Sequence, residues 1–276
     1  MRVACLQMNS TDVVEANLEV AGALLDQAAA AGVALAVLPE MFPFMHPELE
    51  QKRNFAAAVA EQQVLPFLSA TARRHGLALI GGSLLLPGRD GLLRNSCPVF
   101  NADGTCLAIY DKIHLFDVDL PDRRYHESAQ IAAGTETRVC ELNGWKTGLS
   151  ICYDLRFPEL YRAYAAAGVS LLPVPSAFTV PTGEAHWELL LRARAVENQA
   201  YVLAAAQIGT HPGGRTTYGH SMIVDPWGKV LARAENRAGR AGECVVANID
   251  TAEVAWVRER MPVQAHRRPD LFGPAG

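Results

Sequence analysis

The sequence predicts an α/β fold in which two sheets are faced by helices. Apolar runs of strand length recur about ten times between turn signals, and four longer segments carry apolar residues at helical spacing. The chain also opens with the order strand, helix, strand, which is typical of parallel sheets. At 276 residues, half of them hydrophobic, the chain can bury a sizeable core, and we expect a single domain.

The first elements form the β-α-β opening. Residues 2–8 and 33–38 are the two predicted strands, which we expect to be parallel neighbours with a right-handed crossover. Asp12 with Glu15 forms a capping-box-like start to the helix between them, which ends near Gly32.

A longer helical segment and a group of short strands follow. Helical spacing runs from residue 52 to residue 75 with an interruption at Pro66, and Gly76 is a good C-cap. The next apolar runs predict strands in a meander as far as residue 112. Residues 113–134 lack periodicity, and compact domains rarely keep so long a loop without a use. We therefore expect this loop to serve a function.

The second half alternates strands and helices. Asn143-Gly144 predicts the turn of a hairpin, and Pro226 to Gly228 predicts the turn of another. The remaining predicted elements are a helix from Pro158 to Gly168, a strand over 169–177, a helix over 183–199, a strand over 200–207 and a last strand over 242–249.

Cys152 stands on a sharp turn between the apolar run 145–151 and the helix that Pro158 opens. A helix N-terminus beside the sulfur would favour both the thiolate and an oxyanion formed next to it. The turn therefore suits acyl chemistry. The alternative is a small buried hydrophobic residue, because free cysteine is among the most buried residue types.

Two charged residues also follow strand-like runs. Glu40 ends the run VALAVLPE, and Lys112 ends the run TCLAIYDK. The ends of strands are where α/β sheets form their ligand crevices, so a carboxylate, an ammonium and a thiol are expected there together. An ordinary strand-end acid and a surface lysine are the alternatives for each residue taken alone.

The flanking segments carry a family resemblance. LPEMF around Glu40, YDKIHLFD around Lys112 and GLSICYDLRFPELYR around Cys152 resemble the three signature segments of the nitrilase, or carbon–nitrogen hydrolase, superfamily. The resemblance runs from about Arg2 to about Ile249. It implies a four-layer α-β-β-α sandwich and a Glu–Lys–Cys triad. The single hydrolase domain would span residues 1–260, followed by a tail, 261–276, that is either loose or packed on a partner subunit.

The resemblance also implies roles for the residues. Cys152 would be the nucleophile, Glu40 the general base and acid, and Lys112 together with the Tyr153 backbone N–H would stabilise the oxyanion. Glu127 resembles the second glutamate that accompanies the triad, and it would hold Lys112 in place. A Cys–His mechanism of protease type is the rival, but the histidines available to it stand in no recognisable protease signature. These are His114, His126, His186 and His220.

The segment over residues 182–230 most resembles the Nit branch, which contains the deaminated-glutathione amidases and the ω-amidases. The resemblance implies hydrolysis of a small carboxylate-bearing linear amide to acid and ammonia through a thioester. Deaminated glutathione is the first candidate substrate and 2-oxoglutaramate the second. A nitrilase, or a catalytically idle binding or scaffold protein, is the alternative.

Anionic substrates of this kind require a cationic group in the pocket, and arginine matches a carboxylate best. The candidates, which the sequence does not rank, are Arg123, Arg124, Arg156 and Arg215. Phe44, Phe178 and His186 are further predicted substrate contacts.

Composition narrows the partners and the location. The formal net charge of −4 and the lack of any block of like charge argue against nucleic acid as a partner. We expect a cytoplasmic protein, because MRVACLQM lacks the features of an export signal and the six cysteines are scattered. No metal, nucleotide or organic cofactor is implied. A homodimer or larger homo-oligomer, formed through helices next to the Cys152 turn, is expected by resemblance.

Overall fold

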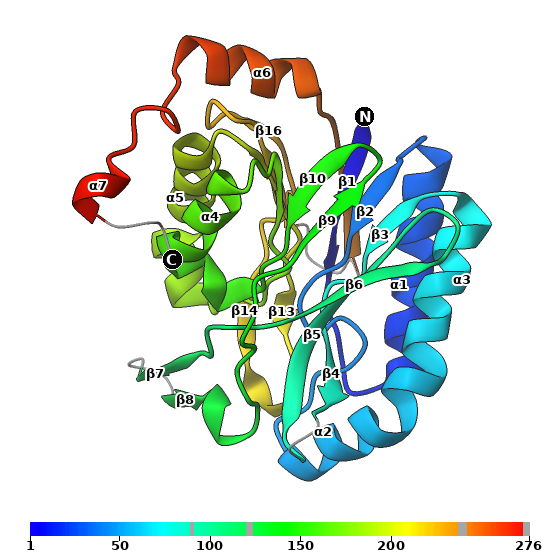
Figure 1. Ribbon diagram of the computed structural model, residues 1–276. Coiled ribbons are helices and arrows are strands. Elements are labelled where there is room, and N and C mark those ends of the chain that lie inside the picture. Colours follow the sequence, from blue (N-terminus) through cyan, green and yellow to red (C-terminus); the bar gives the residue numbers. More distant parts are fainter. Residues whose placement is uncertain (89–90, 120–123, 237–241, 273–276) are drawn as a thin grey trace.

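The first strand shows how the layers are built. In β1 (Arg2–Met8), Val3 and Cys5 pack into one core cluster, whereas Ala4 and Leu6 pack into another. Successive side chains of a strand point to opposite faces, so this sheet is buried on both sides and needs a layer against each. The computed structural model, which describes residues 1–88, 91–119, 124–236 and 242–272, places a second sheet on one side and helices on the other (Figure 1).

The first sheet has seven strands within the described residues. β1 and β2 are parallel, with Val3 opposite Leu35, which confirms the predicted parallel opening. β2 is parallel to β3, and β5 is antiparallel to β3, β4 and β6, so β2 and β6 run in the same direction. The further strands are β2 (Leu35–Val37), β3 (Ala78–Ile80), β4 (Leu84–Pro87), β5 (Leu93–Phe100), β6 (Cys106–Asp111) and β17 (Gly242–Asn248).

The second sheet has six strands over the same described ranges. Its hairpin turns at Asn143 and Gly144, whose φ angles of 50° and 78° are both left-handed, as a two-residue hairpin requires. This confirms the predicted turn. The strands in spatial order are β16 (Val230–Arg233), β15 (Met222–Val224), β12 (Tyr201–Ala204), β11 (Leu171–Pro173), β10 (Trp145–Gly148) and β9 (Val139–Leu142).

Two small sheets stand apart from the large ones. One pairs β7 (Asp117–Asp119) with β8 (Arg124–His126), and the other pairs β13 (Ile208–Thr210) with β14 (Thr216–Tyr218). β7 and β8 belong to the long loop over residues 113–134, so part of this loop is ordered into a hairpin.

Helices cover both outer faces (Figure 1). The first sheet is covered by α1 (Val14–Ala30), α2 (Leu49–Phe55), a π-helical segment (Ala56–Val64) and α3 (Leu65–His75). The second sheet is covered by α4 (Pro158–Ala166) and α5 (Val180–Asn198), and the chain then continues through α6 (Thr251–Arg260) to α7 (Pro269–Phe272). The order helix, sheet, sheet, helix confirms the α-β-β-α sandwich. Of the helices described, none has both the length and the apolarity needed to cross a bilayer.

Two predictions about helices, the start of α1 and the effect of Pro66, differ from the structure. The N-cap of α1 is Val13, which has no capping side chain, and its N–H donates to Thr11 Oγ1, so the predicted Asp12–Glu15 capping box is wrong. Pro66 does not end the helix, because the helical run continues from Leu49 to His75 and changes from π-helical to α-helical geometry just before it, between Val64 and Leu65. The C-cap at Gly76 is confirmed by its left-handed φ of 62°.

Candidate active site

Three strands bring polar side chains to one edge of the first sheet. Because β2 and β6 run in one direction and β5 runs against them, the ends of β2 and β6 meet the start of β5. Glu40 follows β2, Lys112 follows β6, and Asn95 lies near the start of β5. The Lys112 backbone N–H donates to the Asn95 carbonyl at 2.9 Å, which fixes their relative positions.

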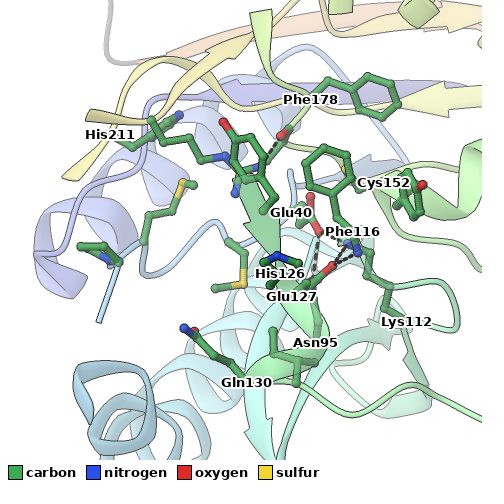
Figure 2. Close-up of a pocket in the computed structure, with 18 of the residues that line it drawn as sticks. Glu40, Asn95, Lys112, Phe116, His126, Glu127, Gln130, Cys152, Phe178 and His211 are labelled. Atoms are coloured by element: carbon green, nitrogen blue, oxygen red, sulfur yellow. Dashed lines mark hydrogen bonds and ion pairs between the residues drawn. The ribbon is translucent and has the colours of Figure 1, made fainter. Parts of the chain in front are cut away.

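A hydrogen-bonded cluster links these side chains to Glu127 (Figure 2). Lys112 Nζ donates to Glu40 Oε1 at 3.0 Å and to Glu127 Oε2 at 2.8 Å. Asn95 Nδ2 donates to the same two carboxylates, at 3.0 Å to Glu40 Oε1 and 3.3 Å to Glu127 Oε1. Glu127 Oε2 also accepts from the Phe116 backbone N–H at 2.7 Å. The long loop therefore supplies one of the two acids of the site.

Cys152 is presented by a turn of the second sheet. Its φ of 48° lies in the left-handed region that side chains other than glycine rarely adopt. Its backbone N–H donates to the Pro175 carbonyl at 2.9 Å. The thiol faces the Glu40 carboxylate, whose charge raises its pKa, and lies near the Ala177 backbone N–H, which lowers it. The strained turn thus holds the sulfur against the acid of the other sheet.

Asp154 ties this turn to the segment around Lys112. Its fully buried carboxylate accepts from the Ile151 backbone N–H at 2.8 Å and from the Tyr110 hydroxyl at 2.7 Å. It also accepts from the His114 backbone N–H at 3.0 Å and lies 2.7 Å from His114 Nδ1. One buried carboxylate therefore connects residues on both sides of the site.

Burial and neighbouring charges set the protonation states. Burial acts to raise the pKa of Glu40, but the charges of Lys112 and Arg215 outweigh it, so that pKa is lowered. Burial acts to lower the pKa of Lys112, but the two glutamates raise it above its ordinary value. Burial, followed by the charge of Glu40, raises the pKa of the Cys152 thiol. The resting site therefore holds a carboxylate, an ammonium and a neutral thiol.

The helix N-terminus expected beside the sulfur has a smaller effect than burial. The helix that was expected to favour the thiolate, α4, begins only at Pro158, and Cys152 opens a short 3-10 helix, Cys152–Arg156. Five residues in a 3-10 turn contribute little dipole to oppose burial. The thiol therefore needs a base at the moment of attack.

The cluster opens into a pocket of about 220 Å³. Sites for drug-sized ligands are roughly 300–1,000 Å³, so this pocket suits a small molecule. Glu40, Lys112, Glu127 and Cys152 all line it, as does Tyr153. In the described part of the chain, the Tyr153 backbone N–H has no protein acceptor. Among the same residues, no group of three or more His, Cys, Asp or Glu side chains is arranged to hold a metal ion.

Of the three predicted substrate contacts, one lines the pocket. Phe178 does so, whereas Phe44 and His186 are not among the described residues of the wall. The Phe44 ring is stacked against Phe55, with centroids 4.8 Å apart, and His186 Nδ1 lies 3.2 Å from an Arg156 nitrogen on the exposed side of α5. The contact given for Phe44 is thus with a residue outside this pocket, and that for His186 is with the pocket residue Arg156.

Two of the four candidate arginines line the pocket, Arg156 and Arg215. Arg124 is not in the described wall; its largely exposed side chain forms an ion pair with Asp119 at 2.6 Å. Arg123 lies outside the described residues. The structure thus ranks Arg156 and Arg215 above Arg124 as contacts for a substrate carboxylate.

Sequence reasoning missed two amide side chains, Asn95 and Gln207. Gln207 Nε2 donates to the Glu40 carbonyl at 3.1 Å and to Ser10 Oγ at 2.7 Å, so it holds the backbone that carries the acid. Asn95 stands between an arginine and a serine in the strand segment RNSCPVF, and Gln207 ends the apolar run AYVLAAAQ. An amide in or at the end of a buried run is a usable signal, because a buried amide needs hydrogen-bonding partners.

Known proteins resemble this chain over nearly its whole length. A profile described as carbon-nitrogen hydrolase matches residues 2–259. The omega-amidase NIT2 of Danio rerio is 39% identical over 98% of this chain and 96% of its own, and the deaminated glutathione amidase of Synechocystis sp. is 42% identical over 96% and 97%. The crystal structure of the C. elegans NitFhit protein is 40% identical with a TM-score of 0.89, covering 98% of this chain and 65% of that longer one.

Fold, pocket and relatives together define a hydrolase that acts on carbon–nitrogen bonds other than peptide bonds. More specifically, the chain belongs to the carbon–nitrogen hydrolase family, as the three signature segments indicated.

Proposed function

We propose that this protein is a thiol amidohydrolase for small carboxylate-bearing amides, with Cys152 as nucleophile and Glu40 as its base. The observation that carries the proposal is that a buried thiol and a buried carboxylate, with Lys112 bonded to that carboxylate, line one pocket. An unactivated amide resists attack by a neutral thiol, so the thiol proton must leave as the new bond forms. Glu40 is the carboxylate that faces the thiol and influences its pKa.

In the first half-reaction, the Cys152 sulfur bonds to the amide carbon while its proton passes to Glu40. Lys112 spends two of its three ammonium hydrogens on Glu40 and Glu127, which leaves the third for the developing oxyanion beside the Tyr153 backbone N–H. Glu127 keeps the ammonium in position. The carbon–nitrogen bond then breaks as Glu40 returns the proton to the leaving amine, and a thioester remains on Cys152.

In the second half-reaction, Glu40 takes a proton from water as the water oxygen attacks the thioester carbon. The same donors stabilise the second oxyanion. Its collapse breaks the carbon–sulfur bond, the acid leaves, and Glu40 returns the proton to the Cys152 sulfur. The site is then back in its resting state.

The substrate is proposed to carry a carboxylate, because the pocket that contains the two acids is also lined by Arg156 and Arg215, and arginine binds carboxylates well. Deaminated glutathione is the first candidate and 2-oxoglutaramate the second, each supported by the name of a relative about 40% identical over nearly the whole chain. The leaving group expected from the sequence needs correction. The scissile amide nitrogen of glutathione belongs to its cysteine, so that substrate releases a dipeptide amine, whereas 2-oxoglutaramate releases ammonia.

The test is to incubate the protein with each compound and to measure 2-oxoglutarate, the acid that both reactions release. Ammonia and free dipeptide amine are measured in parallel to identify the leaving group. Wild type should release 2-oxoglutarate from at least one compound, and Cys152→Ala from neither. Alanine in place of Arg156 or Arg215 should raise KM on the order of tenfold or more. Silence of wild type with both compounds would sink the substrate assignment.

Further proposals concern domain, assembly and location. Residues 1–260 are proposed to act as one hydrolase domain, supported by the family match over residues 2–259. A homodimer through α4 and α5 is supported by Leu189 and Val196 of α5, which are 68% and 46% exposed. Size-exclusion chromatography with light scattering, which measures the mass of the eluted protein, tests this assembly. A cytoplasmic location is supported by the six free thiols, since reducing compartments keep cysteines in that form.

A further inference from the structure

Asn95 is placed between the two acids of the site without being part of the triad. Its side chain is 2% exposed, and its Nδ2 uses one hydrogen on Glu40 Oε1 and the other on Glu127 Oε1. The two acids come from segments far apart in sequence, one after β2 and one in the long loop. A single amide group therefore links them at a fixed separation.

The other end of this amide has no partner. Asn95 Oδ1 is buried and accepts no hydrogen bond from the described residues. A buried oxygen without a donor is unfavourable, and turning the amide over would place that oxygen against two carboxylates. The observed orientation thus leaves Oδ1 without a donor among the described residues, while both N–H groups of the amide donate to the acids. Unsatisfied buried groups of this kind concentrate at functional sites.

We propose that Asn95 is a positioning residue that holds Glu40 and Glu127 at a fixed separation, favours the ionised form of Glu40, and assigns the two oxygens of Glu40 to different tasks. Oε1 accepts from both Asn95 and Lys112, so Oε2 is the oxygen left for the Cys152 proton. A hydrogen bond donated to a carboxylate favours its ionised form. Asn95 supplies two such bonds without adding a second positive charge beside Lys112. The inference rests on the proposed role of Glu40 as base.

The titration of Glu40 depends on other ionisable groups besides its contact with Asn95. Groups from several elements surround the two acids. Those acting on Glu40 directly are Lys112, Arg215 and Cys152. Further ionisable groups lining the same pocket, besides Glu127, are His46, Lys52, Tyr125, His126, Tyr153, Arg156 and His211. A change confined to position 95 leaves all of these in place.

The test follows the rate at which iodoacetamide alkylates Cys152 between about pH 4 and about pH 9. Peptide mapping separates Cys152 from the exposed Cys106. Alkylation requires the thiol proton to pass to ionised Glu40. The fall of the alkylation rate at low pH, called the acid limb below, therefore reports the ionisation of Glu40. Asn95→Asp replaces the donor by a third carboxylate in nearly the same shape, and its acid limb should move up by about one pH unit or more. Asn95→Ala removes one donor from each acid and should move the limb in the same direction by less.

Asn198→Asp is the matched control. Asn198 is likewise buried, at 1% exposed, and its Oδ1 has no partner among the described residues. Its Nδ2 donates to the Arg194 carbonyl and to Glu197 Oε1, and it does not line the pocket. Its acid limb should coincide with that of wild type. In hydrolysis, Asn95→Asp should lose on the order of 100-fold in kcat at neutral pH.

Acid limbs for Asn95→Asp and Asn95→Ala that coincide with wild type would overturn the proposal, whatever happens to their hydrolysis. If Asn95→Asp does not fold, the shift of Asn95→Ala decides alone. Alkylation needs no substrate, so inactivity of wild type toward both amides would remove the substrate assignment and leave this result intact.

Discussion

The first sheet presents its part of the site on the ends of regular strands, whereas the second sheet presents Cys152 on a strained turn. In the first sheet, the Asn95 and Lys112 side chains both donate to Glu40 at 3.0 Å, which fixes the three relative to one another. Cys152 instead has a φ of 48°, and its turn is held by backbone bonds to Pro175 and Asp154.

The difference follows from the chemistry of the side chains. A carboxylate and an ammonium attract each other strongly in a buried site, so their charges position them once the strands bring them close. A neutral thiol is a weak hydrogen-bonding group, so the surrounding backbone must position it. Changes of charge should therefore disable the first region, and changes to turn-holding bonds should disable the second.

The largest effect is expected from removing the reacting group of either region. Glu40→Gln removes the base and Cys152→Ala the sulfur, and each should lower kcat/KM by at least ~10⁴-fold, because the two groups act as a unit. Combining them should cost little more than either alone. The measurement is 2-oxoglutarate release, and a double variant far worse than both singles would contradict this interdependence.

The next effect tests the turn. Asp154→Asn sets an N–H group against existing donors, and kcat should fall about 100-fold with little change in KM, because the sulfur is displaced rather than removed. Asp225→Asn is the control, since this buried acid holds the β15–β16 turn through the Trp227 and Lys229 backbone N–H groups. Both variants should lose stability in urea, but only Asp154→Asn should lose activity. Equal kcat in the two would show that the Asp154 bonds do not position Cys152.

A smaller effect, on stability, is expected from His211, which lies outside the two regions. His211 is buried between the Ser10 carbonyl and Thr217 Oγ1, and burial lowers its pKa to about 4. Its folded pKa is below the unfolded one, so the unfolded chain binds the extra proton, and stability falls as pH drops from about 6.5 toward about 4. The loss between pH 7 and pH 5 should be about 2 kcal/mol in urea unfolding. His211→Asn should remove most of this decrease in the free energy of unfolding between pH 7 and pH 5. An unchanged pH dependence would assign the loss to other groups.

The smallest effect is expected outside both regions. Arg124 and Asp119 form an exposed ion pair, with side chains 70% and 65% exposed, and such pairs contribute roughly 0–1 kcal/mol. Arg124→Ala should leave kcat/KM within about twofold of wild type. A rise in KM comparable to that of Arg156→Ala would instead place Arg124 in substrate binding.

Local chemistry determined much of this protein. Asn143-Gly144 is readable as a hairpin turn because few residue pairs adopt two left-handed conformations, and Gly76 is readable as a C-cap for the same reason. The segments around Glu40, Lys112 and Cys152 likewise carry enough residues to indicate the family.

Only the tertiary structure decided which distant segments meet. It placed Asn95 between two acids and put Arg156 and Arg215, but not Arg124, in the described wall of the pocket. It also made the thiol of Cys152 neutral, because burial and a facing carboxylate outweigh a short 3-10 turn. These outcomes depend on distances and burial between segments tens of residues apart, and one-dimensional patterns contain neither quantity.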